Sequence, residues 1–485
     1  MRVDITDLKN YINPNIIKQL PNKTYEIKQY NAIDFLVPER FDLLAKILYV
    51  KHKINNTKSS IFTDLYLKHI EAFNGFYEAD GSNKIGKEKF VTEFDKIIDS
   101  INKKGLFENT VIPSSKGVIV DGAHRVATSI YFNKSIKSVS LSLETINFDY
   151  NYFRNRGLSN SYLDLMALEY INLKKSNLFL IFLWPSNGGQ QDKNVANILK
   201  KYGKVVYRKN VELTKKGSIN LIRSLYENEN WVGSPKNNYI GAMNKANWCF
   251  NKSGPVKVVL FESDKDMIVM KGEIRELFDI QKHSIHITDT IDEVQIFSKL
   301  IFNSNTINWL NHSSFTEFSW FNKLFKDYRA WITENNLDPD NFCIDGSSTL
   351  SAYGIRTARD IDFFYSQKES LSTGFKEIDC HNSRFDFNQE KIHDIVYNPK
   401  NYFYYKSHKF ISLKNIKEYK LERSESKDIK DLQMIDELLS NMKSKITIKY
   451  IFNSYLNFDY LKGRVKFILL KMRYNLVKLK NAIKN

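Results

Sequence analysis

The stretch Cys343-Ile344-Asp345-Gly346-Ser347-Ser348-Thr349-Leu350 decides the fold that we expect for the C-terminal third of the chain. It predicts an apolar strand that runs into a turn of small residues and then into a short helix. After that helix comes Arg359-Asp360-Ile361-Asp362-Phe363-Phe364, with a second strand expected over Ile361–Tyr365. The order of strand, turn, helix and strand brings the small-residue turn next to a pair of acidic residues.

Asp360 and Asp362 are candidate metal ligands. Residues two apart in a strand point to the same side, which puts the two carboxylates about 7 Å apart. Two like charges at that spacing are unfavourable unless a divalent cation lies between them, and hard oxygen ligands suit Mg²⁺. Gly346 permits close backbone approach, and the hydroxyls of Ser347 and Ser348 can hold phosphate oxygens with the amides of the next helix. A metal held here would bridge triphosphate oxygens during an in-line displacement.

These two motifs resemble the nucleotidyltransferase superfamily, whose signature is a Gly-Ser turn followed by an Asp-x-Asp strand. The resemblance covers roughly residues 340–440 and implies a catalytic site in which Asp360 and Asp362 bind Mg²⁺. It continues in Phe385-Asp386-Phe387, which implies a third metal-binding carboxylate, Asp386, on a neighbouring strand. The basic residues of the family's helical extension often lie near phosphates. The phosphate-binding residues that it implies are Gly346, Ser347, Ser348, Arg359, Lys420, Arg423 and Lys427.

Two other interpretations of this segment stay open. Asp-x-Asp pairs often occur by chance, so Asp360 and Asp362 could be a solvated acidic pair beside a surface turn. Arg356 and Arg359 could contact phosphates or form ion pairs with neighbouring carboxylates. The order of the elements around the Gly-Ser turn favours the catalytic interpretation.

A second strand, glycine turn and helix start occurs at Val118-Ile119-Val120-Asp121-Gly122-Ala123-His124-Arg125-Val126-Ala127. The amides at the start of that helix, together with Arg125 and His124, predict an anion pocket that suits phosphate. The stretch resembles the ParB/sulfiredoxin superfamily over about residues 85–145. The resemblance implies ATP or CTP binding through Asp121, Gly122, His124 and Arg125.

Function is less narrowly defined for this N-terminal segment. Sulfinic acid reduction needs a reactive cysteine near the turn, and no cysteine precedes Cys249. A DNA-partitioning protein would add a helix-turn-helix, which residues 150–175 do not clearly show. A nucleotide-binding or kinase-like domain is therefore expected. The alternative is structural, with Asp121 capping the helix and Arg125 paired on the surface.

Residues 175–312, between these two segments, alternate predicted strands and helices, an α/β signature. The loop Trp184-Pro185-Ser186-Asn187-Gly188-Gly189 follows a predicted buried strand, where α/β folds place ligand loops. His283 and His286 would point to opposite faces of an extended segment, so we expect no shared metal. One of them is a candidate acid, base or phosphate ligand, and the alternative is a structural role for both. One long helix is expected over Asp292–Leu310.

Composition limits the class of protein. The chain has 485 residues, which predicts two or three domains, and three scattered cysteines argue against disulfides and a structural zinc site. The N-terminus lacks the apolar run of a signal peptide, and no apolar stretch is long enough to span a membrane. A net charge of +17 indicates a polyanionic substrate or neighbour.

The C-terminal tail concentrates this charge, because no acidic residue occurs from Leu461 to Asn485. Its composition predicts a cationic amphipathic helix that lies on anionic lipids. The alternatives are a helix docked on its own protein and nucleic-acid binding. The apolar stripe consists of Leu461, Val465, Ile468, Leu469, Met472, Leu476, Leu479 and Ile483.

The sequence thus predicts a multidomain α/β and α+β protein. We expect a ParB/sulfiredoxin-like domain over residues 1–150, a middle α/β domain over 175–312, a nucleotidyltransferase-like domain over 313–440 and a basic helical tail over 441–485. The expected function is Mg²⁺-dependent nucleotidyl or phosphoryl transfer to a sugar or alditol (or its phosphate) in bacterial surface-polysaccharide assembly. Such an enzyme would be cytoplasmic and peripheral at the inner membrane. The alternatives are a ParB-like DNA-binding protein or nuclease with an accessory transferase, and a toxin-like nucleotidyltransferase; nucleic acid is the less favoured partner.

Overall fold

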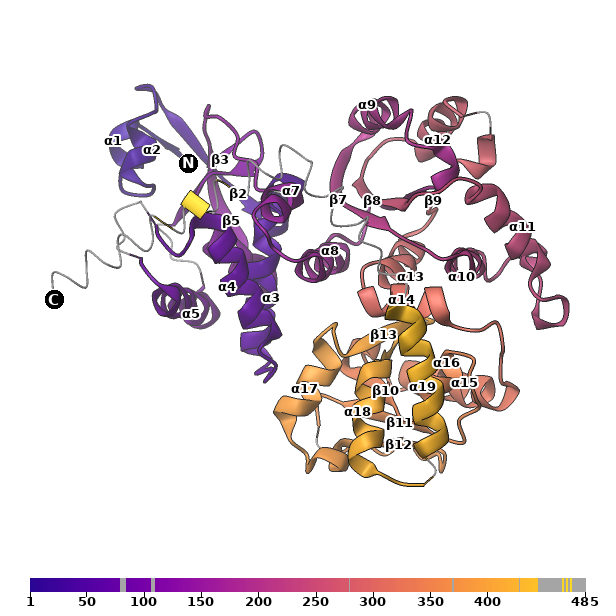
Figure 1. Ribbon diagram of the computed structural model, residues 1–485. Helices are drawn as coiled ribbons and strands as arrows, with labels where there is room; N and C mark the ends of the chain where they lie inside the picture. The colour runs from indigo at the N-terminus through magenta and orange to yellow at the C-terminus, as the bar shows by residue number, and fades with distance from the viewer. Residues whose placement is uncertain are drawn as a thin grey trace. The chain divides into compact units, whose positions relative to one another are not determined.

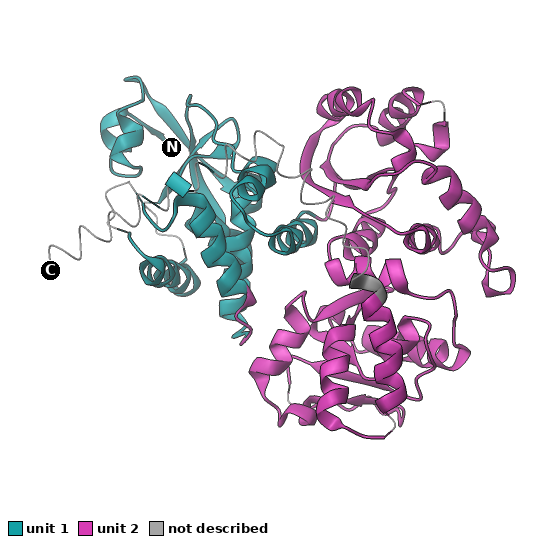
Figure 2. Ribbon diagram, in the orientation of Figure 1, with its two compact units in different colours: residues 1–57, 62–174, 449–485 teal, residues 58–61, 175–448 magenta. Residues whose placement is uncertain are grey.

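In a computed structural model, the described part of the chain contains three separate sheets, each flanked by helices (Figure 1). The structure describes residues 1–78, 84–105, 110–278, 280–368, 370–426 and 428–443, together with Val465, Ile468, Leu469 and Met472. The chain divides into two compact units (Figure 2). Residues 1–57 and 62–174 belong to the first, and residues 58–61 and 175–448 to the second.

The first unit contains a mixed five-stranded sheet in which β3 and β5 are parallel and the other neighbours are antiparallel. Helix α5 (Lys87–Lys104) shows why its helices pack as they do. Its residues Phe90, Phe94 and Ile98 recur every four positions and are all buried, so they form one apolar face. The sheet order is β1 (Arg2–Val3), β2 (Tyr25–Asn31), β5 (Ser135–Ser140), β3 (Val111–Ser115) and β4 (Val118–Ile119).

The middle sheet has antiparallel neighbours throughout, whereas an alternation of strands and helices typically gives parallel ones. The reason is that the β6–β7 and β8–β9 connections each join two parallel strands with a third strand inserted between them, while the helical β7–β8 connection joins antiparallel neighbours. Strand β8 lies between β6 and β7, and β6 lies between β8 and β9. The strands are β6 (Leu178–Leu183), β7 (Lys204–Val211), β8 (Val256–Glu262) and β9 (Ile285–Ile287).

Helices cover both faces of this middle sheet, which explains why β6 is apolar along its whole length. Ile181 and Leu183 pack with residues of α9 (Asp192–Tyr202) and α12 (Met267–Glu276). On the opposite face, Phe182 contacts His286, whose ring in turn lies against Phe297 of α13 (Ile291–Ile301).

The third sheet carries the acidic pair. Strand β10 is antiparallel to β11 and parallel to β14, and β11 is parallel to β12. Helix α15 (Ser319–Glu334) packs an aromatic face with Tyr328 and Trp331 against Phe363 of β11. The sheet order is β12 (Ile378–Cys380), β11 (Ile361–Tyr365), β10 (Phe342–Asp345), β14 (His408–Ile411) and β13 (Tyr402–Tyr405).

Several predicted elements are confirmed, and one is wrong. The sequence predicts strands over Leu178–Leu183 and Ile361–Tyr365 and a helix over Ala123–Tyr131, and β6, β11 and α6 have these bounds. The single helix expected over Asp292–Leu310 is instead α13 and α14 (Ser304–His312). The side chain of Asn303 accepts the amide hydrogen of Thr306 at 3.0 Å and so caps a new helix there.

Most of the basic tail lies outside the described residues. Four residues of its predicted apolar stripe are described, and each is helical. Val465, Ile468, Leu469 and Met472 are 53 to 58% exposed, so their apolar side chains are not covered by the rest of the described chain. Within the ranges described above, no helix combines the length and apolar character needed to cross a membrane.

Candidate functional site

The glycine turn and the acidic strand lie side by side. Strands β10 and β11 pair with Asp345 opposite Asp362. Gly346 follows with a φ of +67°, a left-handed conformation that favours glycine. A Cβ atom at Gly346 would lie 3.2 Å from Oδ2 of Asp362. The close approach expected of this glycine is therefore an approach to the second aspartate of the pair.

The two serines of the turn play different parts. The buried hydroxyl of Ser348 donates a hydrogen bond to the carbonyl oxygen of Asp360 at 3.0 Å, so it ties the start of α16 (Ser348–Ala352) to the acidic strand. Ser347 is only partly buried and lines a cavity next to the acidic pair. Of the two hydroxyls, that of Ser347 is the one placed to contact a ligand.

A cavity of about 490 Å³ adjoins the turn and both aspartates. Among the described residues of its lining, six arginines and lysines face three aspartates, so this wall carries a positive surplus that suits a polyphosphate. The lining residues are Gly346, Ser347, Arg356, Arg359, Asp360, Asp362, His381, Arg384, Ile416, Tyr419, Lys420, Arg423, Lys430, Asp431 and Met434.

The carboxylates crowd one another at this cavity. The pKa of Asp362 is raised to about 6; burial is the largest cause, His381 lowers the pKa, and the charges of Asp360, Asp345 and Asp379 raise it. A carboxyl group with such a pKa has too little compensating positive charge around it. A bound divalent cation would supply that charge, and this favours a metal site over a solvated acidic pair.

Asp345, His381 and Arg384 form a group that the sequence did not reveal. Asp345 is fully buried; burial alone would raise the pKa of its carboxyl, but His381, Arg384 and the Gly346 amide outweigh that effect and lower it. Nη1 of Arg384 lies 2.5 Å from Oδ2 of Asp345, and Nε2 of His381 lies 3.2 Å from Oδ1 of Asp362. The only local signals were a carboxylate directly before Gly346 and a histidine directly after β12.

Metal ligands are fewer than predicted. Across the described ranges, no three His, Cys, Asp or Glu side chains are close enough to form a metal-binding group. Oδ1 of Asp345 is nevertheless buried without a hydrogen-bond partner in that part of the chain, and it belongs to the residue paired with Asp362. Mg²⁺ commonly takes one or two protein carboxylates and completes its shell with water and substrate phosphates. Asp360 and Asp362 fit that pattern.

Asp386 is not on a strand, contrary to the prediction. It follows the short 3₁₀ helix Asn382–Phe385, where Asp386 and Phe387 both have positive φ angles. Asp386 lines a separate, neighbouring cavity with Asn388 and does not line the one beside Asp362. An apolar-Asp-apolar pattern is satisfied by a tight turn as well as by a strand, which is why the pattern misplaced this residue.

Ion pairs occupy most of the basic residues expected at phosphates. Arg356 donates two hydrogen bonds of 2.6 Å to the carboxylate of Asp431. Of the two roles considered for Arg356, phosphate contact and ion pair, the structure shows the ion pair. Lys420 lies 2.8 Å from Asp428 and 2.7 Å from Asp431. Arg423 also binds Asp428. The ion pairs of Lys420 and Arg423 link α18 (Leu413–Arg423) to α19 (Asp428–Lys443).

Two cations at the cavity differ from those of this network. Arg359 and Lys430 are exposed and line the cavity, and no ion pair with another described residue engages either side chain. They are therefore available to a phosphate without breaking an existing pair. The remaining candidate, Lys427, lies outside the described residues.

The N-terminal glycine turn has a different geometry. Gly122 has a φ of +85°, and a Cβ atom there would meet Cδ1 of Ile112 at 2.6 Å and Nη2 of Arg125 at 3.1 Å. Asp121 accepts the Gly122 amide hydrogen at 2.6 Å, and its other oxygen lies 3.9 Å from Arg125. The guanidinium of Arg125 thus folds back over the turn.

His124 does not present a cation at this turn. Its ring packs against Phe94, and its Nε2 lies 2.9 Å from the hydroxyl of Tyr66. Burial, followed by the charges of Lys46 and Lys84, holds the pKa of His124 well below its ordinary value. Arg125 and the amides of α6 are left as the groups that could meet a phosphate.

The two middle histidines belong to structural contacts. The ring of His283 stacks on Trp248, and Nδ1 of His286 lies 3.1 Å from the hydroxyl of Tyr226. Burial, with nearby Lys271, lowers the pKa of His286 to about 3, so this side chain is neutral at ordinary pH. Neither lines a cavity that we describe, which agrees with the structural alternative for both.

No protein-family model, no curated protein and no solved structure matches this chain. The relation to nucleotidyltransferases and to ParB/sulfiredoxin proteins is therefore a resemblance of short motifs.

Proposed function

We propose that the C-terminal domain is a Mg²⁺-dependent nucleotidyl- or phosphotransferase. The observation that carries this proposal is the meeting of Asp360 and Asp362 with the Gly346 turn at the wall of a cavity with surplus positive charge. Paired carboxylates attract a divalent cation, and the basic wall attracts a polyphosphate, so the two halves of a metal–triphosphate complex find matching groups.

Each residue has a part that its position supports. Asp360 and Asp362 would hold Mg²⁺, which would offset the charge that develops on the phosphate oxygens. Arg359, Lys430 and Ser347 line the same cavity and would bind those oxygens. Buried Asp345 keeps Arg384 and His381 beside the acidic pair, which makes it a positioning residue.

The transfer step itself needs little from the protein beyond alignment. An acceptor oxygen forms a bond to the α-phosphorus of the nucleotide while the bond to pyrophosphate breaks, and pyrophosphate leaves with the electron pair. A phosphate acceptor is already ionised, so no proton has to move in that case, whereas a hydroxyl acceptor would lose its proton to solvent as the new bond forms. Phosphoryl transfer would run in the same way at the γ-phosphorus, with a nucleoside diphosphate leaving.

For the acceptor we propose a sugar or alditol, or its phosphate, in the assembly of a bacterial surface polysaccharide. This assignment rests on the resemblance of the motifs and on the basic tail. An ATP or CTP site at the Asp121–Arg125 turn stays a prediction, with Arg125 in place of His124 as its main contact.

The test is a turnover assay on the full-length protein. ATP, CTP, GTP and UTP are each supplied with Mg²⁺ and with ribitol 5-phosphate or glucose 1-phosphate, and release of pyrophosphate or nucleoside diphosphate is measured. The proposal expects release with at least one pair of substrates and its loss in Asp360→Asn. Equal release by the wild type and this variant would remove the catalytic role.

A peripheral position at the inner membrane is the second part of the proposal. Its support is the exposure of Val465, Ile468, Leu469 and Met472 in a segment with no acidic residue. Apolar side chains on a cationic helix suit the interface of an anionic bilayer. Co-sedimentation with phosphatidylglycerol vesicles, but not with phosphatidylcholine vesicles, should be strong for the wild type and weak for Leu469→Glu; equal sedimentation of both proteins would contradict this part.

A further inference from the structure

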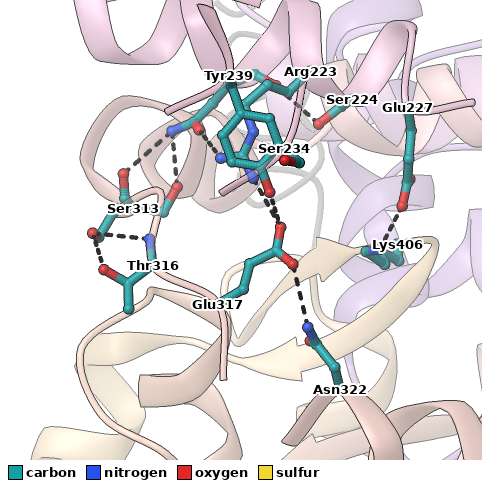
Figure 3. A network of polar contacts seen from close by, with 12 residues as sticks. Arg223, Ser224, Glu227, Ser234, Tyr239, Ser313, Thr316, Glu317, Asn322 and Lys406 are labelled. Atoms are coloured by element: carbon teal, nitrogen blue, oxygen red, sulfur yellow. Dashed lines mark hydrogen bonds and ion pairs between the residues drawn. The ribbon is translucent and has the colours of Figure 1, made fainter. Parts of the chain in front are cut away.

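A second cavity lies in the same unit but shares no lining residue with the one at the aspartates. It measures about 290 Å³. Its walls come from α10 (Lys215–Leu225), from the segment around residues 313–322 and from the β13–β14 turn at Lys406 (Figure 3). The helices of the middle sheet and the third sheet thus build it together.

The charges in its wall cancel in pairs. Nη2 of Arg223 lies 3.1 Å from Oε1 of Glu317, and Lys406 pairs with Glu227 across the cavity wall (Figure 3). Among the described residues that line it, these four are the charged ones, two of each sign. The cavity beside Asp362 has a positive surplus, whereas this one is neutral. A charged ligand would find no uncompensated partner here.

Glu317 is fixed by further donors. The hydroxyl of Tyr239 donates to its Oε1, and Nδ2 of Asn322 donates to its Oε2 at 3.3 Å. The guanidinium of Arg223 stacks 3.6 Å from the centre of the Tyr239 ring. The side chains shown in Figure 3 therefore hold one another in place through hydrogen bonds and ion pairs, so this part of the wall is preorganised for a ligand.

Hydroxyl and amide groups surround this network. Nδ2 of the buried Asn220 donates to Oγ of Ser313 at 3.0 Å, and Nε of Arg223 is buried without a hydrogen-bond partner among the described residues. A buried donor left without a partner is costly and suits a ligand oxygen. The other uncharged polar residues of the wall are Ser224, Ser234, Ser314, Thr316, Asn322, Ser351 and Ser407.

Aromatic rings complete the cavity. They are contributed by Tyr239, Trp309, Phe318, Phe321 and Tyr405. Ring faces offer apolar contact to C–H groups, while the hydroxyls and amides between them accept and donate hydrogen bonds. A molecule that is uncharged, rich in hydroxyls and apolar on its C–H faces matches this combination.

We propose that this cavity binds a neutral sugar or alditol. The balanced charge excludes phosphates and sugar acids as preferred ligands, and the lining supplies both kinds of contact that a polyol needs. Helix α16 connects the two cavities, since it begins next to Ser347 at the catalytic turn and ends at Ser351 and Ala352 in this wall. The ligand would thus lie one short helix away from the transferase site. Binding here does not depend on the proposed transfer reaction.

The experiment measures binding to the full-length protein by saturation-transfer difference NMR and by calorimetry. The probes are glucose, N-acetylglucosamine and ribitol, with glucuronate and inorganic phosphate as charged comparators. We expect saturable binding of at least one neutral probe, at least about ten-fold tighter than glucuronate, which is the effect of one unsatisfied buried charge or donor. No saturable binding of any neutral probe, or tighter binding of glucuronate, would overturn the proposal.

Variants locate the binding. Phe318→Ala removes an aromatic wall, and Asn322→Ala removes a partly exposed amide, so at least one of them should fold. Both variants should bind the neutral probe about ten-fold more weakly than the wild type. Lys326→Ala, which changes an exposed residue of helix α15, should leave the affinity unchanged. Asp360→Asn should bind the probe like the wild type, which separates this site from the catalytic one. Wild-type affinity in both cavity variants would overturn the assignment.

Discussion

The turns at Gly346 and Gly122 can be compared directly, because each follows a short strand, contains a glycine with a positive φ and leads into a helix. At Gly346, the neighbouring strand β11 brings Asp362 against the glycine. At Gly122, the nearest groups are the side chains of Ile112 and Arg125, which belong to the core and to the turn itself. The first turn faces outward to a charged cavity, and the second is closed by its own arginine.

The difference shows what a local motif can and cannot decide. A glycine in the left-handed region and a helix start are local properties, and both segments have them. The chemistry depends on a third segment, which is an acidic strand in one case and the Tyr66 and Phe94 side chains around His124 in the other. We therefore propose catalysis at the C-terminal turn only, and expect variants of the two turns to behave differently.

The largest contrast is expected in turnover. Asp362→Asn should lower nucleotide turnover by at least about 100-fold, since it removes one of two carboxylates that would hold the metal. Arg125→Ala at the other turn should leave turnover unchanged and reduce only a kinase-like step, if one occurs there. Pyrophosphate release under identical Mg²⁺ and nucleotide concentrations measures both. Comparable losses in the two variants would erase the distinction between the turns.

Nucleotide affinity should change next. Arg359→Ala and Lys430→Ala should each raise KM for the nucleotide about ten-fold, because each removes a charge-assisted phosphate contact. Lys391→Ala provides a matched control, since Lys391 lines the neighbouring cavity and not this one. Steady-state kinetics over a nucleotide concentration series gives the values. If KM rises in Lys391→Ala and stays unchanged in Arg359→Ala and Lys430→Ala, the phosphates bind in the neighbouring cavity that Lys391 lines, and this assignment is wrong.

Stability should respond at the N-terminal turn. Gly122→Ala should lower the free energy of unfolding of the first unit by about 1–3 kcal/mol, because the φ of +85° is strained for alanine and the new Cβ would meet Ile112 at 2.6 Å. Gly117→Ala is the control, with a φ of +78° but nothing within 4 Å of the new Cβ. Denaturant unfolding measures both, and equal losses would show that packing at Gly122 contributes nothing beyond the backbone strain.

The smallest effect is expected from the pair at the N-terminal turn itself. Arg125→Ala removes an exposed interaction with Asp121 at 3.9 Å, so the free energy of unfolding should change by less than about 1 kcal/mol. Addition of ATP or CTP during thermal unfolding extends this measurement. Stabilisation of the wild type by either nucleotide, and its loss in Arg125→Ala, would support a phosphate contact there; a loss of several kcal/mol without nucleotide would instead make Arg125 a structural residue.

Local patterns gave much of the secondary structure. Continuous apolar character predicted β6, and the order of strand, turn, short helix and strand predicted β11, both with the observed bounds. The same patterns could not predict that β8 is inserted between β6 and β7, since strand order is set by pairing between distant segments. The loop at Asn303 was also missed, because one capping side chain interrupts an otherwise continuous helical pattern.

Within the site, sequence reasoning reached the groups that are adjacent in the chain and missed those assembled by folding. Asp360, Asp362 and Gly346 could be grouped because a short helix separates them. Asp345 and His381 come together only through the pairing of β10, β11 and β12. Which basic residues are already paired, as Lys420 is with Asp428 and Asp431, likewise depends on how α18 packs against α19.

We propose that a divalent ion joins Asp360 and Asp362. Titration of Mn²⁺ in the presence of a non-hydrolysable nucleoside triphosphate, followed by the electron paramagnetic resonance signal of free Mn²⁺, tests it without requiring the acceptor. We predict a saturable site in the wild type and in Asp386→Asn, and at least ten-fold weaker binding, about 1.4 kcal/mol, in Asp360→Asn and Asp362→Asn. Equal Mn²⁺ affinity in all four proteins would contradict a metal site formed by Asp360 and Asp362.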